Sequence, residues 1–332
     1  TDMYTVGPTL PEVLGTTQPK GNYANLKTKG WELTLSWRDN FKLAGSDFHY
    51  GVKFMLWDSQ SWITKYNNAT GKLSDYYEGY RIGDIWGYNI EGLFTSYDEI
   101  ANHADQDYIK ISDSKIWQPG DLKFADLNGD GKIDKGAQTL SDHGDLVIVG
   151  NEEERYHYGF NLNVGWKGIG ISAFFQGVGK RDWYPGQETG FFWGKYNRPY
   201  GYSLKMHENR WTEENPNPNA YWPRLVGYSS ENGGRPMGTP NNRYMQDASY
   251  LRLKALTVDY SLPQAWVSKL GLTGLKIYFT GENLFTFSNI CENFDPEVIK
   301  GGDVDLKDRK GEEQGYSYPM LKTYTVGLNV SF

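Results

Sequence analysis

Large apolar residues alternate with polar or small residues in seven segments of this chain. In the clearest segment, RYHYGFNLNVGW, an aromatic or aliphatic residue occupies every second position from Tyr156 to Trp166. A period of two is typical of a β-strand with one apolar face. The pattern predicts strands at 26–37, 47–57, 155–166, 170–179, 249–262, 275–287 and 324–332.

Two local features refine this prediction. The segment 249–262 changes phase between Leu253 and Leu256, which predicts a β-bulge. Only Lys167-Gly168-Ile169 separates the third strand from the fourth, which predicts a tight hairpin.

The links between the predicted strands are alternately short and long. The long ones, 58–154, 180–248 and 288–323, together with 1–25, are predicted to be loops at one end of the strands. Ordinary compact domains have loops of about four to six residues. Outer-membrane barrels instead combine short periplasmic turns with long extracellular loops. The pattern therefore predicts an all-β fold, a transmembrane antiparallel up-and-down β-barrel.

In a barrel, the apolar face of each strand meets lipid. Tyr158, Phe160, Leu162 and Val164 are then predicted to face lipid, whereas His157, Asn161 and Asn163 face the lumen. Aromatic residues near strand ends fit an interfacial girdle; they are Trp31, Trp37, Trp57, Tyr156, Trp166, Tyr324 and Phe332. The alternative is a soluble β-sandwich, in which a second sheet covers the apolar face. Bacterial barrels have an even number of strands, from eight upward, so seven strands predict the C-terminal part of a larger barrel.

Composition and charge agree with this fold and exclude other classes. The chain has 12 Trp, 25 Tyr, 15 Phe and 39 Gly, a mixture that favours strands joined by many turns. A net charge of −7 argues against nucleic-acid binding, because no basic surplus exists to neutralise phosphates. The single cysteine, Cys291, excludes an internal disulfide and is expected to be a half-buried packing residue. The first residues, TDMYTVGPTL, carry no signal-peptide pattern.

Six segments, in order, resemble the end of SusC/RagA-like TonB-dependent outer-membrane transporters. These segments are GTTQPKGNYANLKTKGWELTLSW, PGDLKFADLNGDGKID, YGFNLNVGWKGIGISAFFQGVG, ASYLRLKALTVDYSLP, GENLFTFS followed by FDPEV, and YTVGLNVSF.

The resemblance implies a barrel of about 22 strands around a plug domain. It also implies a TonB box, which this chain lacks along with the plug, that contacts the TonB–ExbB–ExbD complex. A SusD-like lipoprotein would act as a lid, and the cargo would be an oligosaccharide or, in some members, a peptide. The terminal aromatic residue, Phe332, matches the signal for barrel insertion.

The segment DLNGDGKID has the spacing of an EF-hand-type calcium loop. Asp126, Asn128 and Asp130 occupy positions one, three and five, Gly131 permits the turn, and the Lys132 carbonyl and Asp134 follow at positions seven and nine. Position twelve is Ala137, which cannot bind a cation. By the family's usual spacing, Asp145 is the candidate replacement and Asp142 the second choice. The alternative is a polar turn without an ion.

The long loops are rich in aromatic rings, which can stack on sugars or pack within the loops. The nominated substrate-binding residues are Trp86, Tyr88, Trp183, Trp193 and Trp222. The five histidines lack metal-ligand spacing, and no nucleophile elbow or P-loop occurs. We therefore expect a non-enzymatic importer of oligosaccharides or peptides in the outer membrane. The rival is a soluble, calcium-stabilised β-sandwich that binds or hydrolyses carbohydrate.

Overall fold

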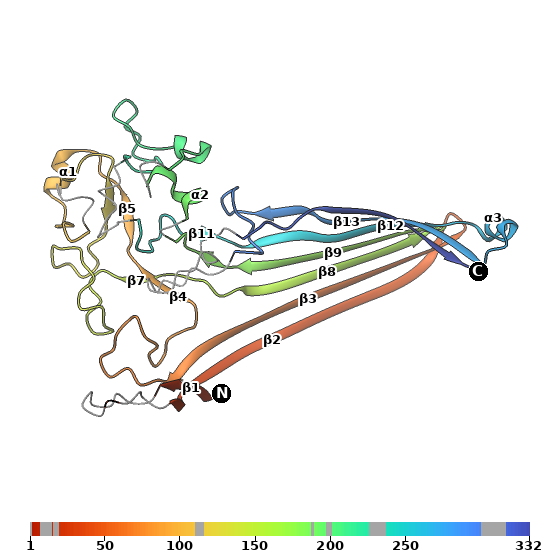
Figure 1. Cartoon of the computed structure of the whole chain (residues 1–332), viewed down its shortest axis with the longest axis horizontal. Coiled ribbons are helices and arrows are strands. Elements are labelled where there is room, and N and C mark those ends of the chain that lie inside the picture. Colours follow the sequence, from red (N-terminus) through yellow and green to blue (C-terminus); the bar gives the residue numbers. More distant parts are fainter. Residues whose placement is uncertain are drawn as a thin grey trace.

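One long β-sheet and one irregular layer make up the molecule (Figure 1). The computed structural model describes residues 2–6, 15, 20–109, 116–186, 189–196, 201–225, 237–299 and 317–332 of the 332-residue chain. We call the described residues of 66–154, 181–249 and 289–299 the loop layer. The links at the opposite end of the sheet lie at what we call the turn end.

The sheet has eight strands, and every neighbouring pair is antiparallel. Its spatial order is β1-β2-β3-β8-β9-β12-β13-β14. The strands are β1 (Asp2–Val6), β2 (Lys20–Leu43), β3 (Ser46–Lys65), β8 (Arg155–Trp166), β9 (Ile169–Lys180), β12 (Tyr250–Ser261), β13 (Gly274–Ser288) and β14 (Thr323–Ser331). Sequence neighbours are also spatial neighbours, so the sheet is an up-and-down meander.

The first two predicted strands are longer than expected, and the predicted loop 1–25 is partly strand. β1 and the start of β2 lie within 1–25, so the sheet has eight strands rather than seven. The residues between 37 and 47 were predicted to form a link, but they extend both strands and leave a turn at Ala44-Gly45. Asp39 and Asn40 interrupt the apolar pattern there, although their backbone pairing with Tyr50 and His49 continues.

The predicted hairpin and bulge are both present. Trp166 pairs with Ile169 around Lys167 and Gly168, whose φ angles of 51° and 83° are those of a type I′ turn. Ile169 therefore belongs to the strand rather than to the turn. The register of β12 shifts between Leu253 and Ala255 against both of its neighbours, as the change of phase predicts.

The loop layer contains three two-stranded sheets and short helical turns. The pairs are β4 (Asp84–Gly87) with β7 (Val147–Asn151), β5 (Ile90–Leu93) with β6 (Leu122–Phe124), and β10 (Asp182–Trp183) with β11 (Gln246–Asp247). The helices are α1 (Tyr97–Ala101), α2 (Gly190–Trp193), η2 (Gly194–Tyr196) and η3 (Lys205–Glu208) in this layer, and α3 (Gln264–Val267) and η5 (Ser268–Leu270) at the turn end. Among the described residues, no helix is long and apolar enough to span a membrane.

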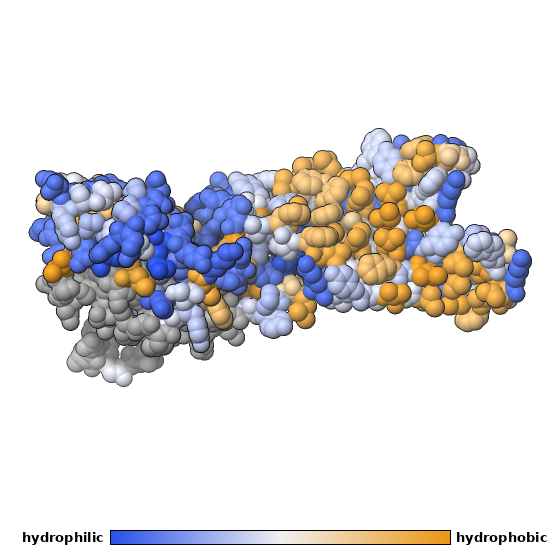
Figure 2. All heavy atoms as spheres, turned by 90° about the horizontal axis from the view of Figure 1, so that it is seen from above, coloured by the Kyte–Doolittle hydropathy of each residue, from blue (hydrophilic) through white to orange (hydrophobic). Residues whose placement is uncertain are grey.

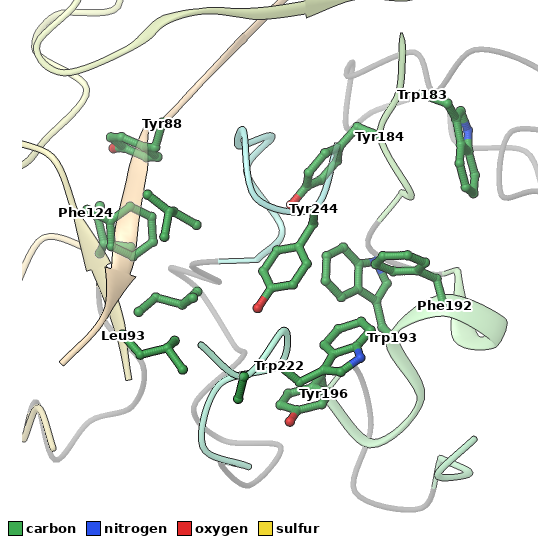
Figure 3. Close-up of a cluster of buried hydrophobic side chains, with 14 of the residues drawn as sticks. Tyr88, Leu93, Phe124, Trp183, Tyr184, Phe192, Trp193, Tyr196, Trp222 and Tyr244 are labelled. Atoms are coloured by element: carbon green, nitrogen blue, oxygen red, sulfur yellow. The ribbon is translucent and has the colours of Figure 1, made fainter. Parts of the chain in front are cut away.

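The main hydrophobic core lies in the loop layer rather than in the sheet. It is built from aromatic side chains of α2, η2 and the surrounding loops (Figure 3). In the sheet, the buried apolar cluster consists of Ala173, Leu253 and Leu284. The sheet therefore has a face that the described part of the chain does not bury.

Candidate functional site

The strand register gathers the apolar side chains on one face of the sheet. Directly paired residues of antiparallel strands point to the same side. One row across seven strands consists of Trp37, Val52, Leu162, Ala173, Leu256, Gly281 and Tyr324. A second row, nearer the turn end, consists of Phe41, Phe48, Trp166, Ile169, Tyr260, Ile277 and Leu328. We call this surface the apolar face.

The apolar face is exposed in this structure. Leu35 and Leu328 retain 57% and 65% of their accessible surface, and Trp37 is similarly exposed. Figure 2 shows hydrophobic residues gathered over the sheet half of the molecule, while hydrophilic residues dominate the loop half. An apolar area that crosses seven strands is far larger than isolated surface residues explain, so it requires an apolar environment or partner.

The opposite face is polar, and we call it the polar face. One of its rows consists of Arg38, Gly51, Asn163, Ser172, Thr257, Thr280 and Thr325. The hydroxyl groups of Thr257 and Thr280 lie 2.9 Å apart in a hydrogen bond. His157 and Asn161 share this side, as predicted, because they alternate with Phe160 along β8.

One residue of the predicted aromatic girdle lies on the wrong face. Trp57 pairs with His157 on the polar face, and the two rings stack with centroids 5.0 Å apart. Its position is odd whereas Phe54 and Leu56 are even, so the pleat turns it away from the apolar face.

The nominated substrate-binding rings form the core of the loop layer. Trp183, Trp222, Tyr88 and Trp193 are buried, and the half-buried Trp86 packs against the same core. Figure 3 shows Trp193 and Trp222 directed toward Tyr196 and Tyr244. Trp222 stacks on both tyrosine rings, with centroids 5.0 and 5.2 Å away. A buried ring has no face open to a sugar, so we assign these residues to packing.

Hydrogen bonds fix two of these indole rings. Trp193 donates to the Gly186 carbonyl over 2.8 Å, and Trp222 donates to the Met206 carbonyl over 2.9 Å. Buried indole groups normally require such partners. These hydrogen bonds orient the two rings locally, and the ring contacts of Trp193 and Trp222 with Tyr244 join segments that are farther apart in sequence.

The acidic loop at 126–134 has a hydrogen-bonded turn conformation. The Asp126 carboxylate accepts the N–H groups of Gly129 and Gly131 over 2.7 and 2.9 Å. Asn128 and Asp130 each accept the N–H group two residues later. Gly129 and Gly131 adopt φ angles of 75° and 81°, a region that favours glycine.

Asp145 is the residue that closes this loop. Its fully buried carboxylate accepts N–H groups from Leu127 over 2.7 Å and from Asp134 over 2.9 Å. Asp142 instead accepts the N–H group of Ala137 in the next turn. Asp145 therefore lies beside the acidic loop and Asp142 lies outside it, and the role of Asp145 as a cation ligand stays a prediction.

The oxygen donors of the acidic loop suit a hard cation such as calcium in chemical type. Their geometry is set by hydrogen bonds to the backbone instead. Within the described ranges, no group of three or more His, Cys, Asp and Glu side chains is placed to hold a metal ion. Lys132 occupies position seven of the loop, where its carbonyl oxygen was predicted to bind the cation; this role stays a prediction.

A charged cluster that the sequence pattern did not reveal connects the sheet to the loop layer. Arg252, only 3% exposed, donates to Asp295 over 2.6 Å, to Glu297 over 2.5 Å and to the Thr286 hydroxyl over 2.8 Å. Lys254, at the bulge, donates to the other oxygen of Glu297 over 2.7 Å. Asp295 and Glu297 belong to the FDPEV segment. The only sequence signal for this cluster was the presence of two acidic residues in that segment and of two basic residues, Arg252 and Lys254, in β12.

A second buried ion pair lies within the loop layer. The Arg224 guanidinium group donates to Asp121 through two nitrogens, Nε and Nη2, each 3.0 Å from a carboxylate oxygen. Burial raises the pKa of Asp121, and the Arg224 charge opposes that shift. The contact joins residues more than 100 positions apart and tethers the strand pair β5–β6 to residues 220–225.

Comparison with known proteins identifies relatives of one kind. TonB-dependent receptor P3 of Formosa agariphila is 26% identical to this chain over 97% of the chain and 30% of the receptor. TonB-dependent receptor P26 of the same organism is 28% identical over 98% of the chain and 31% of the receptor. The chain thus spans about a third of the length of the curated relatives it matches. No family model matches the chain.

Solved structures agree in fold. The RagAB peptide transporter matches all of this chain with a TM-score of 0.62 at 19% identity, and the match covers 32% of that protein chain. The open-open state of the RagAB peptide importer matches with a TM-score of 0.61 at 20% identity, over 100% of this chain and 31% of that one. The resemblance to SusC/RagA-like TonB-dependent transporters is confirmed.

Proposed function

Starting from this resemblance, we propose that the protein is an outer-membrane importer energised through TonB, and that this chain is part of its barrel wall. The observation that carries the proposal is the exposed apolar face, continuous across seven strands. In lipid, the apolar side chains of this face are removed from water, so their exposure at the surface carries no hydrophobic free-energy cost. The polar face would then line the lumen.

The dimensions of the apolar face support a membrane. Leu33 and Leu43 are the first and last aliphatic residues in phase along β2. Ten residues of strand span about 33 Å, which corresponds to about 25 Å along the membrane normal at a tilt of about 40°. This height is that of the apolar band of outer-membrane barrels.

A soluble β-sandwich requires a second sheet on the apolar face. Over the described ranges, the other sheets are two-stranded and belong to the loop layer. The exposed side chains of β2 and β14 argue against such a cover. The sandwich, with its carbohydrate-binding or glycosidase activity, is therefore the weaker alternative.

Closure of the barrel requires further strands. Residues 27–43 of β2 pair only with β3 among the described residues, and β14 pairs only with β13. Unpaired edges cannot face lipid, because backbone polar groups need partners there. We propose that additional strands continue the sheet into a barrel of about 22 strands around a plug domain.

The proposed partners follow from the resemblance. A plug and a TonB box elsewhere in the intact protein would contact the TonB–ExbB–ExbD complex. A SusD-like lipoprotein would cover the loop layer, which lies at the end of the sheet opposite the turn end. The structural relatives are described as RagAB, a peptide transporter or importer.

The proposed cargo is an oligosaccharide, with a peptide as the alternative. Four of the five nominated rings are buried and Trp86 is half-buried, so support for the glycan comes from the resemblance alone. The RagAB structures are of a peptide transporter, which favours the alternative. Growth of a deletion strain on defined glycans or peptides distinguishes the two, because the strain should fail to grow only on the compound that the protein imports.

We also propose a structural calcium ion at the acidic loop. The order of Asp126, Asn128 and Asp130, and the buried Asp145 beside them, support it. The ion would bind these oxygens and thereby hold in place the first part of the segment that connects β6 to β7. The opposing observation is that backbone N–H groups already satisfy the same oxygens.

Fractionation tests the transporter proposal. The intact protein should be recovered in the outer membrane and should migrate faster on unheated detergent gels than after boiling, because barrels stay folded in detergent. Recovery in the soluble fraction with heat-independent migration would exclude the proposal.

A further inference from the structure

The link between β12 and β13 differs from the other links at the turn end. Two residues suffice for the β2–β3 and β8–β9 turns. The β12–β13 link instead spans 262–273 and contains α3 and η5. Figure 1 places this segment beyond the sheet, beside the C-terminus and far from the loop layer. A hairpin does not need such a segment, so its length calls for another explanation.

The segment buries one side and exposes two large apolar side chains on another. Val267 is fully buried, whereas Trp266 and Leu270 keep 59% and 67% of their surface exposed. Trp266 belongs to α3 and Leu270 to η5, so each of the two successive turns exposes one large apolar side chain. Water is an unfavourable environment for both side chains.

Local hydrogen bonds hold this arrangement. The Ser268 hydroxyl donates to the Gln264 carbonyl over 2.6 Å, and Gly271 ends η5 with a φ of 71°. The N–H of Leu272 returns to the Val267 carbonyl, and that of Leu262 bonds the Leu275 carbonyl of β13. The exposed pair is thus presented by a closed turn.

The segment continues the apolar face and carries little charge. Tyr260 and Ile277, on the row nearest to it, are themselves exposed members of that face. From 262 to 272 the sequence is LPQAWVSKLGL, with one lysine and no acidic residue. Figure 2 shows hydrophobic residues reaching the turn end of the molecule. Tryptophan, leucine and one lysine suit the boundary between phospholipid headgroups and acyl chains.

We propose that the α3–η5 segment is an interfacial membrane anchor. Trp266 and Leu270 enter the leaflet at the turn end, and Lys269 meets phosphate headgroups. The segment thereby fixes the depth of the neighbouring strands. This inference rests on the proposed membrane function, since it needs the apolar face to lie in the same bilayer.

Depth-dependent fluorescence quenching tests the anchor. In the intact protein, Cys291 and every cysteine outside this chain are replaced by serine. A single cysteine is then introduced as Trp266→Cys or Leu270→Cys and labelled with a polarity-sensitive dye. The labelled protein is reconstituted into phosphatidylcholine–phosphatidylglycerol vesicles that contain lipids brominated at shallow or deep positions. Val326→Cys on the apolar face and Tyr202→Cys in the loop layer are the matched controls, because both native side chains are highly exposed.

The anchor predicts blue-shifted dye emission at 266 and 270, with at least about twofold stronger quenching by shallow than by deep bromines. The label at 326 should be quenched by deep bromines, and the label at 202 should behave as in water. The anchor is overturned if the labels at 266 and 270 show the water-like emission of the label at 202, or if they are shielded from water but not quenched by brominated lipid. Quenching of the label at 326 would still support the membrane function in either case. An unquenched label at 326 would overturn both. Heat-dependent migration of each labelled variant confirms that it is folded.

Discussion

At the residue scale, single polar side chains decide how the loop layer is joined to the sheet. Arg252 points from a strand into a cluster of two carboxylates, where almost no water reaches it. His207 is similarly embedded: its Nδ1 atom accepts the Leu204 N–H over 2.9 Å, and its Nε2 atom is 2.7 Å from the Phe192 carbonyl. The Arg252 contacts join segments distant in sequence, whereas the His207 contacts hold the turn at 204–207 against α2 within the loop layer.

Removing the Arg252 side chain should free the FDPEV segment. Arg252→Ala leaves Asp295 and Glu297 buried without their main cation, which typically costs about 3–5 kcal/mol. Hydrogen exchange of residues 294–299 should accelerate. The matched control is Lys276→Ala, whose more exposed pair with Asp259 should be worth less than about 1 kcal/mol. Equal effects of the two variants would contradict the role of Arg252.

Acid should loosen the loop layer through His207. Burial lowers the pKa of His207, and the nearby Arg210 charge adds to this effect. The folded state therefore binds fewer protons than the unfolded state, so stability falls as the pH drops from about 6.5 toward the lowered pKa. Limited proteolysis of residues 189–225 should be faster at pH 5 than at pH 7.5. His207→Phe, which cannot titrate, should reduce this difference; an unchanged difference would exclude His207 as its source.

At the element scale, the strands were predictable where pairing and alternation coincide. Tyr158, Phe160 and Leu162 alternate without a fault, so β8 has the predicted bounds. β2 extends past Trp37 because its backbone remains paired at Asp39 and Asn40, and β3 extends past Trp57 because residues 58–65 pair with residues 25–31. Side-chain character carries no strand signal in these extensions. Burial of Trp183 depends on its contact with Phe294, a long-range packing that spacing cannot predict.

The register of β12 beyond its bulge should be essential for the apolar face. Deleting Thr257 would bring Val258 and Tyr260 to the polar face, because one residue of register inverts every following side chain. The folded fraction on unheated gels should fall to background. Lys254→Ala keeps the bulge and loses only the contact with Glu297, so it should assemble. Assembly of the deletion variant would refute the assigned faces.

Calcium should order the acidic loop if the proposed ion binds. Hydrogen exchange of residues 126–145 should slow on addition of millimolar calcium and recover on chelation, since extracellular calcium modules bind at about 0.1–1 mM. Asp126→Asn should remove the response. Asp142→Asn should retain it, because Asp142 lies in the next turn. If calcium does not change the hydrogen-exchange rate of this loop in the unmodified protein, the loop is a polar turn without an ion.

At the scale of the whole molecule, the hydrophobic effect acts in two places. It packs aromatic rings inside the loop layer, and it leaves an exposed apolar face on the sheet, which the proposed membrane would cover. The family resemblance and the alternation were enough to predict the face, since both are local in sequence. The interior of the loop layer was not predictable, because rings that stack on sugars and rings that pack have the same sequence signature.

A matched pair of charged substitutions tests the membrane-facing assignment most directly. Leu162 lies in the middle rows of the apolar face, and the neighbouring Asn163 lies on the polar face. Leu162→Arg should lower the free energy of unfolding from vesicles by about 2–4 kcal/mol, whereas Asn163→Arg should change it little. Equal tolerance of arginine at both positions, measured by denaturant titration of the intact protein in vesicles, would contradict the assignment of the apolar face to lipid.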